Sequence, residues 1–375
     1  MPSRFQRTWI ELSRSALRHN MAQLQQLVGS QVQLMPIVKA NAYGHGVRQT
    51  VDALGDLRRW GFGVATGAEG LQLRTLQPHG RILVLSSWQP AQLRQLVKAQ
   101  LELAVWDEVS LAAIQSLPQS LRRQARVHLK LDTGTTRIGF QRSDLPVLYR
   151  RLARQVIHVV GIFSHFANAE EAGQTRTKQQ LHNFTTLLDA LHIPLQEIDT
   201  HMACTAAAMA YPGARFGLIR PGMGLYGLWP SPQIQARLRA THPTFQLQPV
   251  LSWKSRLLQI KTVPAGTAVG YGSTWHAPRR MSVGVVPVGY ADGYDRHWSN
   301  AAWVTIAGKR APVIGRVCMN MFMVDLRHIR RPRPGQEVTL LGPGITADTL
   351  AALQGTINYE VTTRLSPDIQ RILTR

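Results

Sequence analysis

Between roughly residues 32 and 220 the chain alternates regularly between short apolar segments and amphipathic ones. The amphipathic stretches, such as Gln92–Ala99 and Lys178–Leu191, have apolar residues at helical spacing. Strands that alternate with helices in this way predict a right-handed, parallel (β/α)8 barrel of the α/β class. The alternative is an open doubly wound sheet, which the lack of a GxGxxG turn after the first strand disfavours. The eight predicted strands are Val32–Val38, Trp60–Ala65, Arg81–Leu85, Glu102–Trp106, Arg126–Leu131, Val159–Ser164, Glu197–His201 and Phe216–Arg220.

From about residue 240 the pattern changes to strands separated by Gly and Pro turns, which predicts a mainly β C-terminal domain. One short helix is expected at Thr346–Leu353, with Thr346 as its cap. We predict a barrel domain over residues 11–237. The β-rich domain would consist of residues 238–375 together with residues 1–10. The strands predicted in the second domain are Leu251–Val263, Met281–Val288, Ala302–Ile306, Arg316–Asp325 and Glu337–Leu341.

The formal net charge of +22 raises the hypothesis of a nucleic-acid partner, because clustered Lys and Arg release counterions from phosphates. The arginines are scattered, however, and no aromatic residues interleave with basic runs, which argues against that partner. Two cysteines, Cys204 and Cys318, are too few for a disulfide framework. With no signal peptide and no membrane-length apolar run, we expect a cytoplasmic protein.

Polar and cationic residues follow five of the predicted strands. In a (β/α)8 barrel the active site lies at the C-terminal strand ends, so these side chains should converge. A lysine there can form a Schiff base with an aldehyde cofactor. The residues are Lys39 after the first strand, Lys130 and Arg137 at the fifth, His165 after the sixth, His201 and Thr205 at the seventh, and Arg220 at the eighth.

The string Val-Lys-Ala-Asn-Ala-Tyr-Gly-His-Gly at residues 38–46 resembles the cofactor-lysine motif of the alanine racemases. Further similarity extends from Arg7–Leu12 to Ile357–Val361, nearly the whole chain. The resemblance implies an isomerase that interconverts L-alanine and D-alanine with pyridoxal 5′-phosphate (PLP) and no metal. The D-alanine would supply peptidoglycan precursors, or the reverse reaction would allow D-alanine catabolism.

The same resemblance assigns the cofactor contacts. Lys39 would hold PLP, and Arg220, braced by His201, would face the pyridine nitrogen. A guanidinium has only donors, so it can bond only to an unprotonated ring nitrogen. That makes the ring a weaker electron sink, which suits a racemase better than a transaminase. The phosphate contacts would be Tyr43, Thr205 and the backbone N–H groups of Gly222 and Met223.

Racemisation needs a proton carrier on each face of the substrate. Lys39 serves one face, and the resemblance assigns the other to Tyr271, in Val269–Ser273. Tyr271 would act in the partner subunit of a homodimer with shared active sites. The remaining residues implied by the resemblance are His165 as hydrogen-bond partner of Tyr271, Arg137 and the Met319 backbone as substrate-carboxylate contacts, Lys130 as an orienting and in some members carbamylated residue, and Tyr290 at the substrate entrance.

The chain departs from the commonest family pattern at four places, none of which removes a proposed base. Asn320 stands where aspartate is frequent, and Ser366-Pro367 replaces a tyrosine that contacts the phosphate in some members. Thr135-Thr136 occupies a site where glycine commonly precedes the arginine, and Cys204-Thr205 replaces an Asn-Ser pair.

Three other functions stay open at this stage. A racemase of broader specificity would differ in pocket volume. A PLP-dependent decarboxylase needs no second base, so the Tyr271 motif disfavours it. A PLP carrier without turnover is disfavoured by the second domain.

Overall fold

The computed structural model describes residues 6–154, 157–171, 173–191 and 195–375. Its internal contacts divide the chain into two compact units. The barrel unit contains His19–Ala40 and Leu54–Leu247. The β-rich unit contains the residues up to Arg18, Asn41–Ala53 and Gln248–Arg375. Lys39 therefore lies in the barrel unit, close in sequence to the point where the chain enters the β-rich unit.

Eight parallel strands in the described part of the barrel unit close a ring. Strands β3 to β8 pair in chain order, and β2 pairs with β9. Parallel bridges between Ile37 and Gly63 and between Cys204 and Arg220 join the two sets. The (β/α)8 prediction is thus confirmed, with β2 and β9 much shorter than expected. The strands are β2 (Gln33–Leu34), β3 (Phe62–Thr66), β4 (Ile82–Ser87), β5 (Glu102–Val105), β6 (Arg126–Lys130), β7 (His158–Phe163), β8 (Asp199–His201) and β9 (Leu218–Ile219).

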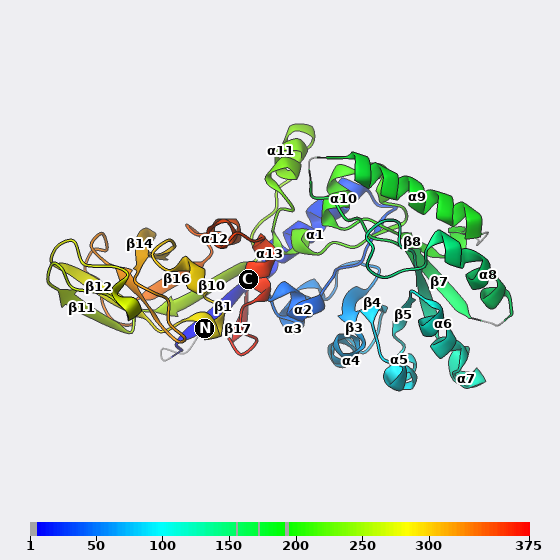
Figure 1. Ribbon diagram of the computed structural model, residues 1–375, viewed down its shortest axis with the longest axis horizontal. Helices are drawn as coiled ribbons and strands as arrows, with labels where there is room; N and C mark the ends of the chain where they lie inside the picture. Colours follow the sequence, from blue (N-terminus) through cyan, green and yellow to red (C-terminus); the bar gives the residue numbers. More distant parts are fainter. Residues whose placement is uncertain (1–5, 155–156, 172, 192–194) are drawn as a thin grey trace. The chain divides into compact units, whose positions relative to one another are not determined.

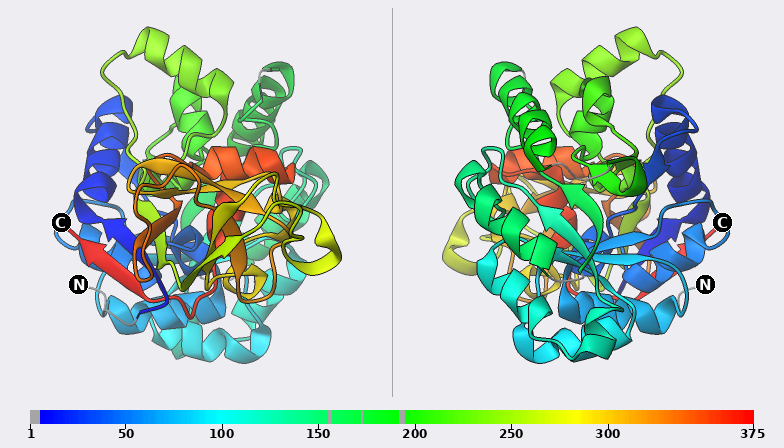
Figure 2. Two further views of the ribbon diagram at one scale, coloured as in Figure 1. Left: turned by 90° about the vertical axis from the view of Figure 1, so that its left-hand side faces the viewer. Right: turned by 90° about the vertical axis from the view of Figure 1, so that its right-hand side faces the viewer.

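Helices follow the strands and lie on the outer side of the ring (Figures 1 and 2). Every residue of β5 is buried, as expected for a parallel strand that is covered on both faces. Two of the helices begin at reciprocal side-chain caps, α4 at Thr66 with Glu69 and α6 at Asp107 with Ser110. The helices wholly within the barrel unit are α4 (Gly67–Leu76), α5 (Leu93–Lys98), α6 (Glu108–Gln115), α7 (Gln119–Arg122), α8 (Leu145–Arg154), α9 (Thr175–Leu191), α10 (Thr205–Ala210) and α11 (Pro232–Thr241). Helices α1 (Arg14–Val28) and α2 (Lys39–Tyr43) contain residues of both units, and all but the last residue of α3 (Val47–Leu54) belong to the β-rich unit.

The β-rich unit is built on a sheet with the strand order β11-β12-β15-β14-β13-β16-β10-β1-β17. Strand β1, near the N-terminus, pairs antiparallel with β10 and parallel with the C-terminal β17. The strands are β1 (Thr8–Ser13), β10 (Leu251–Arg256), β11 (Gln259–Val263), β12 (Met281–Val286), β13 (Trp303–Ile306), β14 (Lys309–Ile314), β15 (Phe322–Asp325), β16 (Glu337–Leu341) and β17 (Arg371–Thr374).

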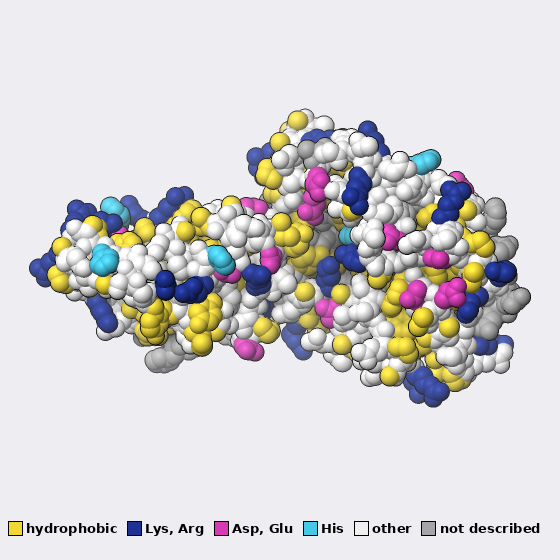
Figure 3. All heavy atoms as spheres, viewed as in Figure 1, with side chains coloured by type: hydrophobic (Ala, Val, Ile, Leu, Met, Phe, Trp, Pro, Cys, Tyr) yellow, Lys and Arg dark blue, Asp and Glu magenta, His cyan; other side chains and the backbone are white. Residues whose placement is uncertain are grey.

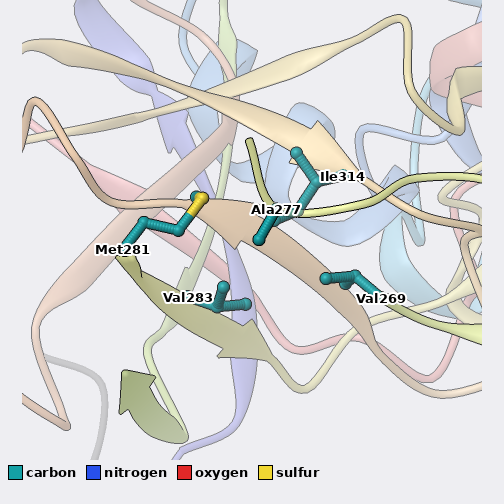
Figure 4. Close-up of a cluster of buried hydrophobic side chains, with 5 residues drawn as sticks. All are labelled: Val269, Ala277, Met281, Val283 and Ile314. Atoms are coloured by element: carbon teal, nitrogen blue, oxygen red, sulfur yellow. The ribbon is translucent and has the colours of Figure 1, made fainter. Parts of the chain in front are cut away.

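Strand β10 buries alternate residues, and β12 and β14 also contribute side chains to the core of the β-rich unit. Figure 4 shows one cluster, in which Met281 and Val283 from β12 and Ile314 from β14 pack with Val269 and Ala277. The chain segment before Tyr271 is therefore anchored in a hydrophobic core. Helix α12 (Ala347–Gln354) begins at the predicted Thr346 cap, and α13 (Asn358–Thr363) follows it.

Three predictions for the β-rich unit were wrong in detail. Leu251–Val263 is two strands, because the chain changes partners at Leu257-Leu258: β10 pairs with β16, and β11 with β12. Within Arg316–Asp325 only the last four residues form a strand. Strand β14 was missed because its charged residues and Pro312 are poor strand formers. The hairpin turn before it, Ala307-Gly308, has positive φ at both residues, as a type I′ turn requires.

The basic residues do not form a single stripe on the face drawn in Figure 3. Lys and Arg side chains lie there in separate groups, with Asp and Glu among them. Among the helices of the described ranges, none is long and apolar enough to cross a membrane.

Candidate active site

The segment after β2 forms a left-handed turn directly beyond Lys39. Ala40, Asn41, Ala42 and Tyr43 have φ values of 51°, 52°, 56° and 54°. This conformation costs an L-residue about 1–2 kcal/mol. Four such residues in succession therefore need strong local contacts to hold them.

Hydrogen bonds on both sides stabilise this turn. In the barrel unit the Ala40 N–H donates to Glu69 Oε1 at 2.7 Å. In the β-rich unit the Gly46 N–H donates to the Asn41 carbonyl at 2.8 Å, and Asn41 Oδ1 accepts from the Val47 N–H at 2.9 Å. The buried His45 ring places Nδ1 within 3.1 Å of the Ala42 carbonyl. Carbonyls only accept, so His45 Nδ1 carries the proton.

Four cationic side chains gather at the C-terminal end of the barrel strands. Lys39 is exposed there, yet desolvation and then the Arg137 guanidinium lower the pKa of its amine. Burial, followed by Arg137 and Arg220, lowers the pKa of Lys130 to about 7. Both lysines therefore deprotonate more easily than an ordinary lysine. Such a surplus of positive charge attracts anions.

Arg220 follows β9 at the barrel closure and is 5% exposed. Its Nη1 lies 2.6 Å from His201 Nδ1, and Nη2 donates to the Ser164 and Met202 carbonyls at 2.7 and 2.9 Å. His165 Nδ1 is 3.3 Å from the same nitrogen. Burial lowers the pKa of Arg220 to about 10, so the guanidinium stays charged at neutral pH. Its orientation is fixed by residues at the ends of two strands, β7 and β8.

Arg137 lies in a loop organised by Asp132. The Asp132 carboxylate accepts hydrogen bonds from the backbone N–H groups of Gly134, Thr135, Thr136 and Arg137, at 2.9 to 3.2 Å. Burial acts to raise the pKa of Asp132, but these four donors outweigh it and lower the pKa below its usual value. The carboxylate is therefore ionised and fixes the loop backbone at Arg137.

Thr205 and the loop after β9 form a compact backbone cradle. Thr205 Oγ1 accepts from the Gly222 and Gly224 N–H groups at 3.1 and 3.3 Å. A Cβ on Gly224 would lie 2.5 Å from Thr205 Cγ2, so only glycine allows this approach. Met223 is the residue between the two glycines. The loop presents consecutive backbone groups beside a hydroxyl, which suits a phosphate.

Four of the predicted site residues belong to the β-rich unit. Tyr43 is half-buried, with its ring edge against Tyr359. The Tyr290 N–H donates to the Cys318 carbonyl, and the Met319 carbonyl accepts from the Ala291 N–H, so the loops of Tyr290 and Met319 are joined through their backbones.

Tyr271 occupies an exposed turn of the β-rich unit. It lies between Gly270 and Gly272, whose φ values are 76° and 72°, and is itself 74% exposed. A Cβ on Gly272 would lie 2.8 Å from Arg316 Nη1. The turn thus packs against Arg316 through Gly272, while the Tyr271 phenol projects outward.

The barrel unit brings together nine of the predicted residues: Lys39, Lys130, Arg137, His165, His201, Thr205, Arg220, Gly222 and Met223. Sequence reasoning missed His128 and Glu102. His128 Nδ1 is 3.0 Å from His201 Nε2, and His128 Nε2 is 2.7 Å from Glu102 Oε2. The available signal was a charged or polar residue inside an otherwise apolar strand, which is costly unless it is paired.

A closed α/β barrel with a lysine and a cationic cluster at its strand ends, together with a β-rich unit, defines a class of two-domain barrel proteins with an anion-attracting site. Matches to two family models cover most of the chain: the alanine racemase N-terminal domain over residues 12–230 and the alanine racemase C-terminal domain over residues 250–373. The chain belongs to the alanine racemase family, whose members are PLP-dependent isomerases.

Individual relatives agree with this assignment. The chain is 36% identical to the alanine racemase of Carboxydothermus hydrogenoformans, over 97% of this chain and 98% of the relative. It is 35% identical to that of Leptospira interrogans serogroup Icterohaemorrhagiae serovar copenhageni, over 98% and 95%. Among solved structures, the biosynthetic alanine racemase from Pseudomonas aeruginosa matches with a TM-score of 0.86 and 33% identity, over 99% of this chain and 100% of that one. The Bacillus anthracis alanine racemase with bound L-Ala-P matches with a TM-score of 0.91 and 30% identity, over 100% and 96%.

The left-handed turn allows a stability test. Ala40 is exposed, so Ala40→Gly removes little packing and relieves the positive φ. We expect the free energy of unfolding in urea to rise by about 0.5–1 kcal/mol. The matched control is Ala112→Gly on the exposed face of α6, which should lower it by about 1 kcal/mol. Equal destabilisation by both changes would show that the turn is not strained.

Proposed function

We propose that this protein interconverts L-alanine and D-alanine with PLP attached to Lys39 Nζ. The observation that carries the proposal is the position of Lys39 after β2, at a barrel end that also holds Lys130, Arg137 and Arg220. Desolvation of the Lys39 amine and then the Arg137 guanidinium lower its pKa. An amine attacks an aldehyde only in its neutral form, so the lowered pKa favours attachment. The membership of the chain in the alanine racemase family supports the same conclusion.

The side chains at the barrel end fit the groups of PLP. Its phosphate is dianionic, and the Thr205 hydroxyl would donate to it, with the Gly222 and Met223 N–H groups as further donors. Without the phosphate the Gly222 N–H donates to Thr205 Oγ1, which places this donor next to the hydroxyl. The Tyr43 phenol would donate a further hydrogen bond to that phosphate. Arg220 offers a donor for the ring nitrogen, while His201 accepts from Arg220 on its other side.

When bound, PLP withdraws electrons from the Cα atom of the amino acid joined to it. Arg220 limits that withdrawal, because a guanidinium cannot accept a proton from the ring nitrogen and so keeps it uncharged. A proton removed from Cα would then return to Cα rather than elsewhere on the cofactor. This selects racemisation over transamination.

Two side chains would move the proton. Lys39 Nζ would remove or return it on one face of Cα, and Tyr271 Oη on the other. We propose that Tyr271 is supplied by the partner in a homodimer, because in a single chain its ring is largely exposed to solvent. His165 would bond to the Tyr271 phenol, since burial and then Arg220 hold the pKa of His165 well below its usual value and keep the ring neutral.

Substrate recognition would come from Arg137 and the Met319 backbone, which bind the carboxylate. Asp132 fixes the Arg137 loop through four backbone N–H groups, so the cation is held in place. Tyr290 would line the entrance, and a wall of Tyr271, Tyr290 and Met319 would favour a small side chain such as a methyl group.

The reaction runs in both directions, so the same enzyme serves D-alanine supply for peptidoglycan or D-alanine breakdown. We propose residues 11–237 as the PLP-binding domain and residues 238–375, with 1–10, as the domain that supplies Tyr271. A cytoplasmic location is supported by the two free thiols, Cys204 and Cys318.

Chiral chromatography of L-alanine incubated with PLP-loaded protein tests the function. We expect the mixture to reach equal amounts of the two enantiomers, because they have the same free energy. Lys39→Ala should reduce the rate by at least about 10²- to 10⁴-fold, the usual contribution of one proton-transfer group. Lys98→Ala, at an exposed lysine of α5, is the matched control and should leave the rate unchanged. Unchanged L-alanine with PLP bound would contradict the proposed reaction.

Tyr271→Phe tests the two-base mechanism in deuterated water. Without the phenol, conversion should fall by about 10²- to 10⁴-fold. Lys39 should still exchange the Cα hydrogen of one enantiomer, which mass spectrometry would detect. Tyr211→Phe, in the barrel unit against Phe166, is the control and should convert and exchange normally. Racemisation by Tyr271→Phe at the wild-type rate would exclude Tyr271 as a base.

Lys130 is expected to be carbamylated. The pKa near 7 makes its amine neutral above that pH, and a neutral amine forms an N–C bond to CO₂ with release of a proton. In ¹³C-bicarbonate, a carbamate NMR signal should grow from about pH 6 to about pH 8 as the amine deprotonates. Lys130→Arg, which keeps the positive charge, should lack the signal. No Lys130-dependent signal at the higher pH would contradict the prediction.

A further inference from the structure

A chain of buried polar side chains leads from Arg220 through the interior of the barrel to the opposite strand ends. Arg220 Nη1 is 2.6 Å from His201 Nδ1, and His201 Nε2 is 3.0 Å from His128 Nδ1. His128 Nε2 is 2.7 Å from Glu102 Oε2. His201 and His128 have no exposed surface, and Glu102 is 2% exposed. We call Arg220, His201, His128 and Glu102 the barrel relay.

The two ends of the relay determine every proton position in it. A guanidinium only donates, so His201 Nδ1 must accept, and the neutral His201 ring therefore carries its proton on Nε2. That N–H points at His128 Nδ1, which must accept in turn. The His128 proton is then on Nε2 and is donated to the Glu102 carboxylate. All hydrogen bonds run in one direction, from a cation to an anion, and such chains strengthen one another.

Glu102 is held as an anion at the far end. Its Oε1 accepts from Arg81 Nε at 2.7 Å and from Arg126 Nε at 3.2 Å. Arg81 also pairs with Asp199 at 2.6 Å. Burial acts to raise the pKa of Glu102, but the bonds from His128 and Arg81 lower it to about 2. A cavity of about 330 Å³ lies at this end, lined in part by Arg81, Glu102 and Arg126.

Packing prevents the two imidazoles from turning. The His201 ring stacks on Phe163 with an interplanar angle of 6° and a centroid distance of 4.9 Å. Trp60 and Phe163 meet His128 edge to face. A Cβ on Gly161 would lie 2.1 Å from His128 Nδ1, so a glycine is needed on β7 to admit the ring. Neither ring can invert without displacing these neighbours.

We propose that Glu102 and His128 are positioning residues, which act through His201 to fix the donor orientation of the Arg220 guanidinium toward the ring nitrogen of PLP. The part that concerns PLP rests on the proposed function, whereas the relay itself does not. A glutamine at position 102 could either donate or accept, so it would no longer fix the His128 tautomer. His128 could then present a proton to His201, and His201 a proton to Arg220, where two donors would oppose each other.

Proton NMR of ¹⁵N-histidine-labelled, deuterated protein tests the relay without any measurement of activity. In the wild type, long-range ¹H–¹⁵N spectra should show both rings neutral, with the proton on Nε2. The two signals are assigned by their loss in His128→Asn and His201→Asn. A proton on His201 Nδ1, or a charged His128, would overturn the proposal. The wild-type spectrum tests the relay even where Glu102→Gln fails to fold.

PLP binding tests the effect on Arg220. In Glu102→Gln the apparent PLP dissociation constant should rise about 10- to 100-fold, the range known for residues that orient metal-bound histidines. The visible absorption maximum of the bound cofactor should also shift. The melting temperature of each variant is measured to show that it is folded. The matched control is Asp199→Asn, which also removes a carboxylate from Arg81 but lies outside the relay. It should keep the wild-type maximum and dissociation constant.

The outcomes separate the two proposals. A Glu102→Gln protein with wild-type absorption and PLP affinity would show that Glu102 has no positioning role. The relay also fails if Asp199→Asn shifts both quantities as much as Glu102→Gln. A wild type that shows the predicted tautomers but does not racemise alanine would contradict the proposed function and leave the relay intact.

Discussion

The site of this protein depends on one buried cation, Arg220. An unpaired buried charge is costly, so the surrounding strands must supply acceptors for it. The Ser164 and Met202 carbonyls and His201 Nδ1 do so, from the ends of β7 and β8. The Arg220 N–H also donates to the Ala203 carbonyl where β8 and β9 meet. The contacts that close the barrel between β8 and β9 therefore also hold the Arg220 guanidinium in place.

The remaining charges follow from this arrangement. Arg220 and Arg137 both lower the pKa of Lys39 and of Lys130, so two lysines become easier to deprotonate at the place where an anion would be attracted. Glu69, the acidic residue next to Lys39, uses its carboxylate to hold the backbone at Ala40 and to cap α4. The left-handed backbone of the turn after Lys39 raises the free energy of the folded chain locally, and this turn accompanies the placement of the lysine at the strand end. Besides the bond to Glu69, its hydrogen bonds involve residues that the sequence motif already contains, Asn41 and His45.

Much of this was predictable because the signals are local. Each of the eight barrel strands was found from its apolar run, since strands buried on both faces have few polar residues. The cationic residues were found because they directly follow those runs. Strands β1 and β17 were missed because each is defined by its pairing with distant parts of the sheet. Strand β1 lies between β10 and β17, both of which are more than two hundred residues after it in sequence. Their short segments give no pattern that distinguishes them from a loop.

His128 and Glu102 were missed for a different reason. In sequence they are polar interruptions of β6 and β5, and nothing nearby identifies their partners. The parallel pairing of β5 with β6 brings Glu102 close to His128. His128 and His201 are on β6 and β8, which are separated by β7, and they meet only because the closed sheet turns both side chains into the barrel interior. The sequence by itself determined the barrel strands, the place of Lys39 after the first of them and the family, because these depend on local pattern and motif. The tertiary structure alone decided which buried groups pair, because a hydrogen bond between strands depends on register and distance, which no single segment contains.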